Sequence, residues 1–268
     1  MAIFYAILLG IVEGLTEFLP ISSTGHLLVA EKLIGYKDSA EIFTVVIQVG
    51  AVASVLWFYR KDIWQKVIDL WRREQQTLAF WRNWIVATIP AGIAGLLLDK
   101  HLQDFSNLLV IALALILGGM AILLIESRHR IKTAKVEPQL ESLTLKQSLQ
   151  IGCYQVLSLV PGVSRSGATI MGGLMSGLDR VTATAFSFYL SLPILILASS
   201  YKIVKNSGSL HLVQGGPLAL LVGTLTTFVV AFGVVGWLLK YVSKHKFTIF
   251  AYYRISLGAL IIIALALR

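Results

Sequence analysis

The chain consists of long apolar runs separated by short polar connections. Six runs are close to the length of about 20 residues with which a helix crosses the hydrocarbon core of a bilayer. They cover roughly 41–58, 84–98, 108–125, 183–201, 217–239 and 248–267. The longest polar connections, near 60–83 and 126–143, leave little room for a water-soluble domain. The pattern therefore predicts an all-α polytopic membrane protein with a single integral membrane domain over residues 1–268.

Two further apolar stretches, near 2–35 and 144–179, are interrupted by polar residues. The first is broken at Pro20-Ile-Ser-Ser-Thr-Gly25 and the second at Pro161-Gly-Val-Ser-Arg-Ser-Gly167. Proline ends a helix because it lacks an N–H and clashes with the preceding turn, and serine or threonine then caps the next helix. Each stretch is therefore predicted as a re-entrant hairpin of two short helices. Irregular backbone at that depth must be buried in protein or line a wet cavity, which makes both breaks candidate functional sites.

The order of these elements predicts an internal repeat. Each broken hairpin is followed by three full crossings, so the second half starts from the opposite face of the membrane. We therefore expect two inverted repeats, about 1–127 and 144–268, joined by a polar linker at about 128–143. In such an architecture the two breaks approach each other near the midplane, and the site lies at the repeat interface.

Composition and charge agree with a membrane location. The chain is 56% hydrophobic and 14% charged, whereas soluble proteins have about 25% charged residues. The net charge of +9 does not indicate a nucleic-acid partner, because the basic residues are interleaved with acidic ones in the connections. Of the 23 Lys and Arg residues, fifteen lie on the side that holds 60–83 and 126–143, and six on the other. The positive-inside rule then places both termini outside a plasma (inner) membrane. The single Cys153 is expected to be buried.

Glu13 and Glu17 are the first candidate functional residues. Four residues apart on a helix, they lie one turn apart on the same face. Two buried carboxylates this close need a proton, a cation or a basic partner to offset their repulsion. A hard divalent cation such as Mg²⁺ suits two carboxylates together with substrate oxygens. The alternative is a pair of protonated or hydrogen-bonded structural acids.

The first break supplies hydroxyl groups and a histidine. Ser22, Ser23 and Thr24 follow Pro20, and His26 lies just inside the second short helix. A lone histidine usually has a structural role. Beside two acids and three hydroxyls, however, it brings a nucleophile and a proton carrier together, which favours a catalytic role.

The second break has the pattern of a phosphate cradle. Ser164, Arg165, Ser166 and Thr169 lie at the start of a short helix, where free N–H groups and an arginine fork bind phosphate. A salt bridge from Arg165 to Glu13 or Glu17 is the alternative, and it is compatible with phosphate binding. Arg254, within the last apolar run, either reaches the membrane interface or makes a second phosphate contact. Gln48 is expected to form an interhelical hydrogen bond.

The two motifs, Glu13-x-x-x-Glu17 running into Pro-Ile-Ser-Ser-Thr-Gly-His26 and Pro161-Gly-Val-Ser-Arg-Ser-Gly-Ala-Thr169, resemble the undecaprenyl-diphosphatase (bacitracin-resistance) family. The resemblance covers essentially the whole chain, and no motif position departs from it. It implies hydrolysis of undecaprenyl diphosphate to undecaprenyl phosphate and inorganic phosphate, which recycles the lipid carrier of peptidoglycan synthesis and confers bacitracin resistance. It also implies a divalent cation, Mg²⁺ or Ca²⁺, and an active site open to the outer face. The functional residues that it implies are Glu13, Glu17, Ser23, His26, Ser164, Arg165, Thr169 and Arg254.

These residues give a mechanistic hypothesis with open alternatives. Glu13 and Glu17 hold the metal, Arg165 and the groups around it hold the phosphates, Ser23 attacks, and His26 carries the proton. His26 itself or a metal-bound water are the other nucleophiles considered. A transporter or flippase of a polyprenyl phosphate or another anion is the rival function, because broken helices in inverted repeats also occur in carriers. The expected partners are the C55 lipid substrate and membrane lipids, and the oligomeric state, including a homo-oligomer, stays open.

Overall fold

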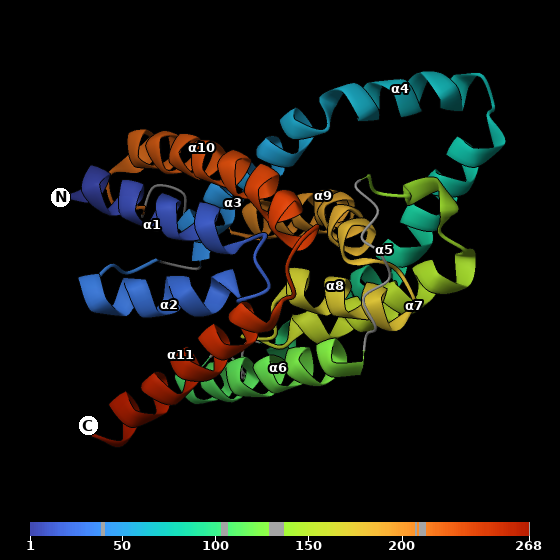
Figure 1. The fold of residues 1–268 in the computed structure, drawn as a ribbon. Coiled ribbons are helices and arrows are strands. Elements are labelled where there is room, and N and C mark those ends of the chain that lie inside the picture. The colour runs from blue at the N-terminus through green and yellow to red at the C-terminus, as the bar shows by residue number, and fades with distance from the viewer. Residues whose placement is uncertain (39–40, 103–106, 129–136, 207, 209–212, 268) are drawn as a thin grey trace.

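A computed structural model gives the fold of this chain and describes residues 1–38, 41–102, 107–128, 137–206, 208 and 213–267. The described residues form an all-helical bundle, as predicted (Figure 1). Both termini lie at the same end of the bundle in this view. Half of the expected linker at 128–143, residues 129–136, lies outside the described residues, and its described end contains the short 3₁₀ helix η3 (Leu140–Ser142).

The six predicted crossings correspond to six helices. These are α3 (Ile42–Phe58), α5 (Gln75–Leu102), α6 (Leu108–Arg128), α9 (Arg180–Lys205), α10 (Gly216–Val242) and α11 (Thr248–Ala266). Within the described residues, five helices are individually long and apolar enough to span a membrane, and a sixth span results if α3 and the helix after it count as one bent span. The prediction of a multi-pass helical membrane protein is confirmed.

The segment after α3 differs from its prediction as a polar connection. It contains helix α4 (Arg60–Trp71), which is bent by 70° relative to α3 and projects from one end of the bundle (Figure 1). Ile63, Trp64, Val67, Ile68 and Trp71 give α4 an apolar face at helical spacing, but the charged residues between them keep the segment polar on average. The helix α5 likewise begins at Gln75, before the apolar run at 84.

Both interrupted stretches form two short helices around a break, as predicted. The first contains α1 (Ala2–Thr16) and α2 (Ser23–Ile34), and the chain reverses direction between them (Figure 1). The second contains α7 (Leu145–Val156), the 3₁₀ turn η4 (Leu157–Leu159) and α8 (Arg165–Met175). In each case the first helix ends shortly before the proline and the second begins at the hydroxyl-rich turn.

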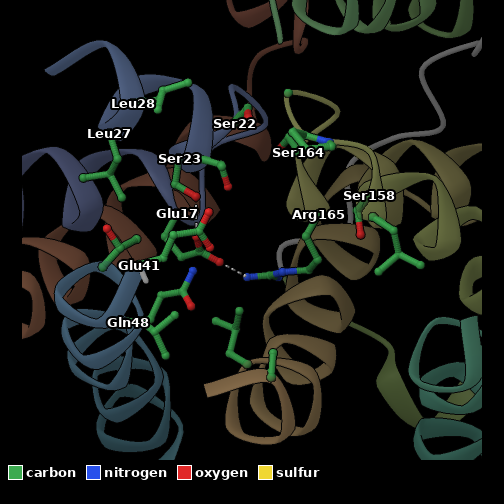
Figure 2. Close-up of a pocket in the computed structure, with 18 of the residues that line it drawn as sticks. Glu17, Ser22, Ser23, Leu27, Leu28, Glu41, Gln48, Ser158, Ser164 and Arg165 are labelled. Carbon is green, nitrogen blue, oxygen red and sulfur yellow. Dashed lines mark hydrogen bonds and ion pairs between the residues drawn. The ribbon is translucent and has the colours of Figure 1, made fainter. Parts of the chain in front are cut away.

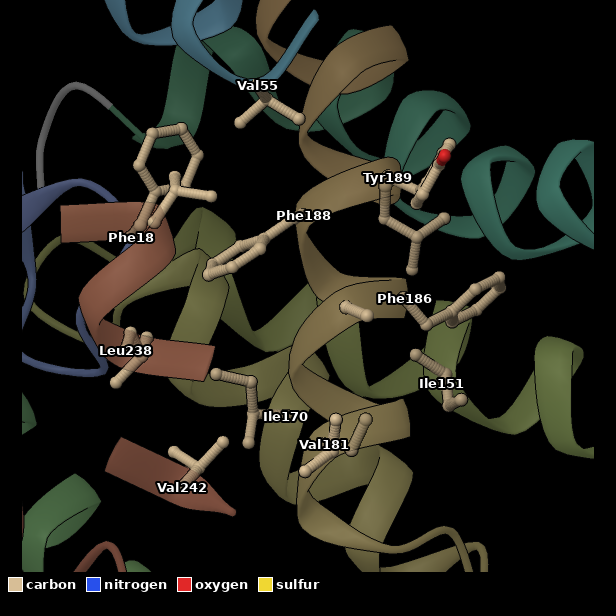
Figure 3. Close-up of a cluster of buried hydrophobic side chains, with 14 of the residues drawn as sticks. Phe18, Val55, Ile151, Ile170, Val181, Phe186, Phe188, Tyr189, Leu238 and Val242 are labelled. Carbon is tan, nitrogen blue, oxygen red and sulfur yellow. The ribbon is translucent and has the colours of Figure 1, made fainter. Parts of the chain in front are cut away.

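The helix α9 lies at the centre of the bundle. Its most apolar window is 72% buried, against 22 to 33% for the other spanning helices. Its Phe186, Phe188 and Tyr189 are almost fully buried among side chains from several helices (Figure 3). Phe18 of the first break packs edge-on against Phe188, with ring centroids 5.3 Å apart. The first break is therefore anchored on the central helix.

Each short first helix packs against a long helix of the other half of the chain. Helix α1 packs mainly on α10, and α7 packs mainly on α5. Glycines permit the close approach: a Cβ on Gly10 would lie 2.7 Å from the Gly223 carbonyl oxygen, and one on Gly152 would lie 2.5 Å from that of Ala87. Small residues at such contacts are typical of membrane helices.

The expectation that Cys153 is buried was wrong, because its side chain is exposed on α7.

Candidate active site

Ser22 and Ser164 cap the second short helices of the two hairpins in the same way. Their φ angles are 73° and 74°, in a region that residues other than glycine seldom adopt. The Ser22 hydroxyl oxygen accepts from Gly25 N at 3.4 Å, and that of Ser164 accepts from Gly167 N at 3.1 Å. A residue other than glycine keeps this backbone conformation only where the surrounding structure fixes it. The two breaks thus have matching, tightly determined shapes.

A cavity of about 340 Å³ lies between the two breaks. Its walls come from α2, α3, α9 and both breaks, and the polar side chains that line it include Glu17, Ser23, Gln48, Ser164 and Arg165. Figure 2 shows Glu17 and Ser23 facing Arg165 across this cavity. The structure therefore brings together polar residues that are about 140 positions apart in the sequence.

Glu17 connects the two breaks. Its Oε2 accepts a hydrogen bond from Ser23 Oγ at 2.6 Å, and its Oε1 accepts one from Arg165 Nη2 at 2.9 Å. Arg165 Nη1 also donates to the carbonyl oxygen of Ser187 on α9, at 3.0 Å. The expected ion pair between Arg165 and a glutamate is present, and both side chains are buried. The arginine thereby offsets the charge of the carboxylate that contacts the Ser23 hydroxyl.

Glu13 has a different environment. It is fully buried, and within the described residues neither of its carboxylate oxygens makes a well-formed hydrogen bond, although the Gln48 side chain and the charge of Arg165 both act on it. An isolated buried carboxylate is too costly to persist in its charged form, so the group requires a proton or a cation. Orphaned oxygens one turn from Glu17 fit a hard cation. Among the described residues there is no group of three or more His, Cys, Asp or Glu side chains that could hold a metal, so a cation beside the two glutamates would need further oxygen ligands of another kind.

His26 faces α11 rather than the cavity. Its Nδ1 lies 2.7 Å from the Ser22 carbonyl oxygen, and its Nε2 lies 2.7 Å from Tyr253 Oη. A carbonyl oxygen can only accept, so Nδ1 carries the proton and Nε2 of the neutral ring accepts from the tyrosine hydroxyl. The Ser23 hydroxyl instead contacts Glu17, which differs from the predicted pairing of Ser23 with His26.

The predicted phosphate residues divide into two groups. Ser164 and Arg165 line the cavity. Ser166 Oγ donates to the Leu19 carbonyl oxygen at 2.7 Å, and Thr169 Oγ1 lies 2.6 Å from Ser187 Oγ, so these two hydroxyls stabilise the protein around the cavity. Arg254 is 1% exposed and bonds to backbone carbonyls, so the expectation that it reaches the membrane interface was wrong.

Several cavity residues were not predicted. Gln48 lines the cavity instead of only bridging helices, and Figure 2 shows its amide pointing from α3 toward the Glu17 carboxylate. Thr44 and Gln48 are spaced four apart on an otherwise apolar helix, a signal that could have found them. The cavity extends to an ion pair of Lys202 with Glu41, whose partners lie at the ends of α9 and α3.

The loop before α3 adds a further acid near this ion pair. Asp38 accepts hydrogen bonds from the backbone N–H groups of Phe43 and Thr44, at 2.9 and 2.8 Å, and thereby caps α3. Burial raises the pKa of Asp38 above its usual range, and these hydrogen bonds oppose the rise. The cavity lining combines the charged side chains of Glu31, Glu41 and Lys202 with apolar side chains such as Leu27, Ile194 and Leu195.

Comparison with known proteins gives one consistent family. The family model described as bacitracin resistance protein BacA matches residues 6–260. The chain is 46% identical over 264 residues to "Undecaprenyl-diphosphatase 1" of Paraburkholderia xenovorans (strain LB400), which covers 96% of this chain and 93% of that protein. It is 42% identical over 261 residues to "Undecaprenyl-diphosphatase" of Nitrosomonas europaea, with the same coverage. It is also 45% identical over 265 residues to "Undecaprenyl-diphosphatase 1" of Burkholderia cenocepacia (strain HI2424), covering 96% and 94%.

Proposed function

The chain belongs to the BacA family of bacitracin resistance proteins, and from this membership we propose that it is an undecaprenyl-diphosphatase. It hydrolyses undecaprenyl diphosphate to undecaprenyl phosphate and inorganic phosphate, and so recycles the lipid carrier for peptidoglycan synthesis and confers bacitracin resistance. The observation that carries the proposal is the Ser23–Glu17–Arg165 arrangement in a cavity between two broken hairpins. It combines a nucleophile, a base and a cation that binds phosphate in one place.

In the proposed reaction, Ser23 Oγ attacks the terminal phosphorus while the bond to the bridging oxygen breaks. Glu17 Oε2, at 2.6 Å, accepts the hydroxyl proton, and undecaprenyl phosphate leaves. Water then displaces the serine oxygen, which regains a proton as inorganic phosphate forms. Arg165 stabilises the charge on the phosphate oxygens throughout, because its guanidinium borders the cavity. Attack by His26 is less well supported, since its Nε2 is bonded to Tyr253.

A divalent cation, Mg²⁺ or Ca²⁺, fits the glutamate pair. Glu13 and Glu17 would hold it, with substrate oxygens as further ligands of the hard type that these ions prefer. The orphaned carboxylate of Glu13 supports this assignment. When bound, the cation neutralises charge on the diphosphate as a Lewis acid.

We further propose that the two halves are inverted repeats, with the site open to the outer face and both termini outside. Four pairs of identical or similar residues support the repeat, and the members of each pair are 142 positions apart in the sequence. The pairs are Gly10 and Gly152, Glu13 and Gln155, Ser22 and Ser164, and Gly25 and Gly167. The paired packing of α1 on α10 and of α7 on α5 supports it further. The orientation rests on the distribution of Lys and Arg.

The rival function is a transporter or flippase for a polyprenyl phosphate or another anion. Such a carrier needs groups that bind the anion, but it does not need a hydroxyl held 2.6 Å from a carboxylate base. The Ser23–Glu17 contact therefore favours the enzyme over the carrier.

The decisive test is phosphate release from undecaprenyl diphosphate by the purified protein in detergent. We expect release that is abolished by EDTA and restored by Mg²⁺ or Ca²⁺, because Arg165 pairs with Glu17 and leaves the second carboxylate, Glu13, without an ion-pair partner among the described residues. Release that persists in EDTA would contradict the metal site. No release by well-folded protein under any metal would contradict the enzyme and favour the carrier.

The contact between Tyr253 and His26 gives a second prediction. Tyr253→Phe removes the hydroxyl that bonds to His26 Nε2, so the imidazole loses the partner that fixes its orientation. If His26 takes part in turnover, the rate of phosphate release should fall by about 10-fold, less than the roughly 10²-fold or more lost when a proton carrier is removed outright, because the imidazole itself is still present. Tyr252→Phe is the matched control, because Tyr252 is the neighbouring tyrosine and its side chain is more exposed than that of Tyr253. Equal rates for Tyr253→Phe and wild type would contradict a role for this contact.

A further inference from the structure

Arg254 occupies an unusual position for a charged residue of a membrane helix. It lies in the first half of α11, yet its side chain is 1% exposed and reaches the region between the two breaks. A buried guanidinium is costly unless it is paired or fully hydrogen-bonded. Its hydrogen bonds therefore indicate what it does.

All five N–H groups of the Arg254 guanidinium donate to backbone carbonyl oxygens, which is the full capacity of an arginine. The acceptors are the carbonyl oxygens of Pro20 in the first break, Gly162 and Val163 in the second break, and Ala114 and Leu115 in α6, at 3.0 to 3.3 Å. No donor is left for a substrate phosphate without breaking one of these bonds.

The breaks themselves explain why such a donor is needed. A helix that ends leaves carbonyl groups without intrahelical partners, and in the low-dielectric interior each unsatisfied group is costly. Pro20 precedes the nucleophile Ser23 by three residues, and Val163 precedes Arg165 by two. One guanidinium therefore satisfies carbonyls immediately before both halves of the site.

We propose that Arg254 is a positioning residue that holds the two breaks in register, so that Ser23 and Glu17 face Arg165. This role rests on the proposed diphosphatase function and replaces the expected phosphate contact. A second bond supports the same register, because Ser166 Oγ of the second break donates to the Leu19 carbonyl oxygen of the first, at 2.7 Å.

Helix α6 makes room for this clamp at Gly118. A Cβ on Gly118 would lie 2.0 Å from Arg254 Nη2 and 2.6 Å from its Cζ, so any side chain there must displace the guanidinium. A Cβ on Gly167 would also approach Arg254 Nη1, at 3.2 Å. Gly118→Ala thus perturbs the clamp while leaving the charge of Arg254 in place.

The first arm of the test compares steady-state kinetics of phosphate release for Arg254→Lys and Gly118→Ala. Lysine has three donors in place of five, and alanine displaces the guanidinium, so in both variants the breaks shift relative to each other. We expect kcat to fall by about 100-fold, the effect of a displacement of roughly 1 Å at a reacting centre. KM should stay within about threefold, because the phosphate-binding groups remain. A KM raised tenfold with kcat unchanged in Arg254→Lys would identify a phosphate ligand and overturn the proposal.

The second arm needs no activity and therefore separates this proposal from the diphosphatase function. Thermal unfolding in detergent is measured for Gly118→Ala, Arg254→Ala and the double variant. Gly118→Ala alone should lower the midpoint by on the order of 10 °C, but it should add little in the Arg254→Ala background, where the group it displaces is absent. Additive losses would overturn the clamp. Arg254→Lys replaces Arg254→Ala if the latter does not fold, since lysine also vacates the space beside Gly118.

Gly233→Ala is the matched control for both measurements. This glycine lies in α10, and a Cβ there meets no heavy atom within 4 Å. The kcat and the unfolding midpoint of Gly233→Ala should match those of wild type. A loss equal to that of Gly118→Ala would show that any alanine in these helices disturbs the protein, and it would overturn the specific contact.

Discussion

Ser23→Ala should reduce phosphate release by at least about 10³-fold, because removal of an attacking nucleophile leaves only binding and electrostatic stabilisation. The hydroxyl lies 2.6 Å from its base Glu17 and borders the cavity, so alanine removes the attacking atom with little change in packing. The loss should appear in kcat, measured with undecaprenyl diphosphate and saturating metal. Ser54→Ala is the matched control, since this buried hydroxyl donates to the Ala51 carbonyl oxygen within α3.

The identity of the nucleophile is decided by trapping the phosphoenzyme. Rapid acid quench of wild type followed by peptide mapping should locate phosphate on Ser23. Phosphate on His26 would show that the histidine attacks and that the observed contact with Tyr253 breaks during turnover. Substantial activity in Ser23→Ala without any phosphoenzyme would instead favour direct attack by water.

The Glu17–Arg165 pair should be strongly coupled. Removing one partner leaves a buried charge without compensation, so Glu17→Gln and Arg165→Ala should each lower stability by about 3–5 kcal/mol. Each should also lower kcat/KM by about 10³-fold, because one variant removes the base and the other removes the phosphate-binding cation. The double variant should be no less stable than the worse single variant. Thermal unfolding and steady-state kinetics on the four proteins give both coupling energies.

The exposed pair of Lys202 with Glu41 is the contrast for the stability measurement. Its side chains are 38% and 58% exposed, so its loss should cost only roughly 0–1 kcal/mol after solvent screening. Arg165→Lys adds a second contrast, because lysine keeps the charge but loses the fork that reaches both Glu17 and Ser187. Additive effects of Glu17→Gln and Arg165→Ala, or full activity in Arg165→Lys, would contradict the coupled arrangement.

The spans and breaks could be predicted from sequence because they depend on local rules. The apolar run at 108–125 must be a helix in a bilayer, and Pro20 followed by hydroxyls must end one helix and cap the next. Helix α4 was missed for the complementary reason. The segment is polar on average, so it was interpreted as a connection although Ile63, Trp64, Val67 and Ile68 recur at helical spacing, and the tertiary structure shows that it continues α3 after a bend.

The residues that belong to the site could be predicted in part, but their roles could not. Glu17 and Arg165 were expected to form a pair because two buried opposite charges require one another. The direction in which His26 points depends on Tyr253, which is 227 residues away, so no local pattern determines it. The burial of Arg254 could not be predicted for a similar reason, because its carbonyl partners come from three separate segments.

The packing of α1 on α10 has a consequence for synthesis. The close contact of Gly10 with Gly223 joins positions that leave the ribosome far apart in time. At about 5–20 residues per second, this interval is roughly 10 to 40 s. During it, the helix that carries Glu13 and Glu17 enters the membrane before Arg165 and its own main packing partner exist. Until the second half of the chain is inserted, the carboxylates of the first hairpin must therefore be protonated, hydrated or in contact with the insertion machinery.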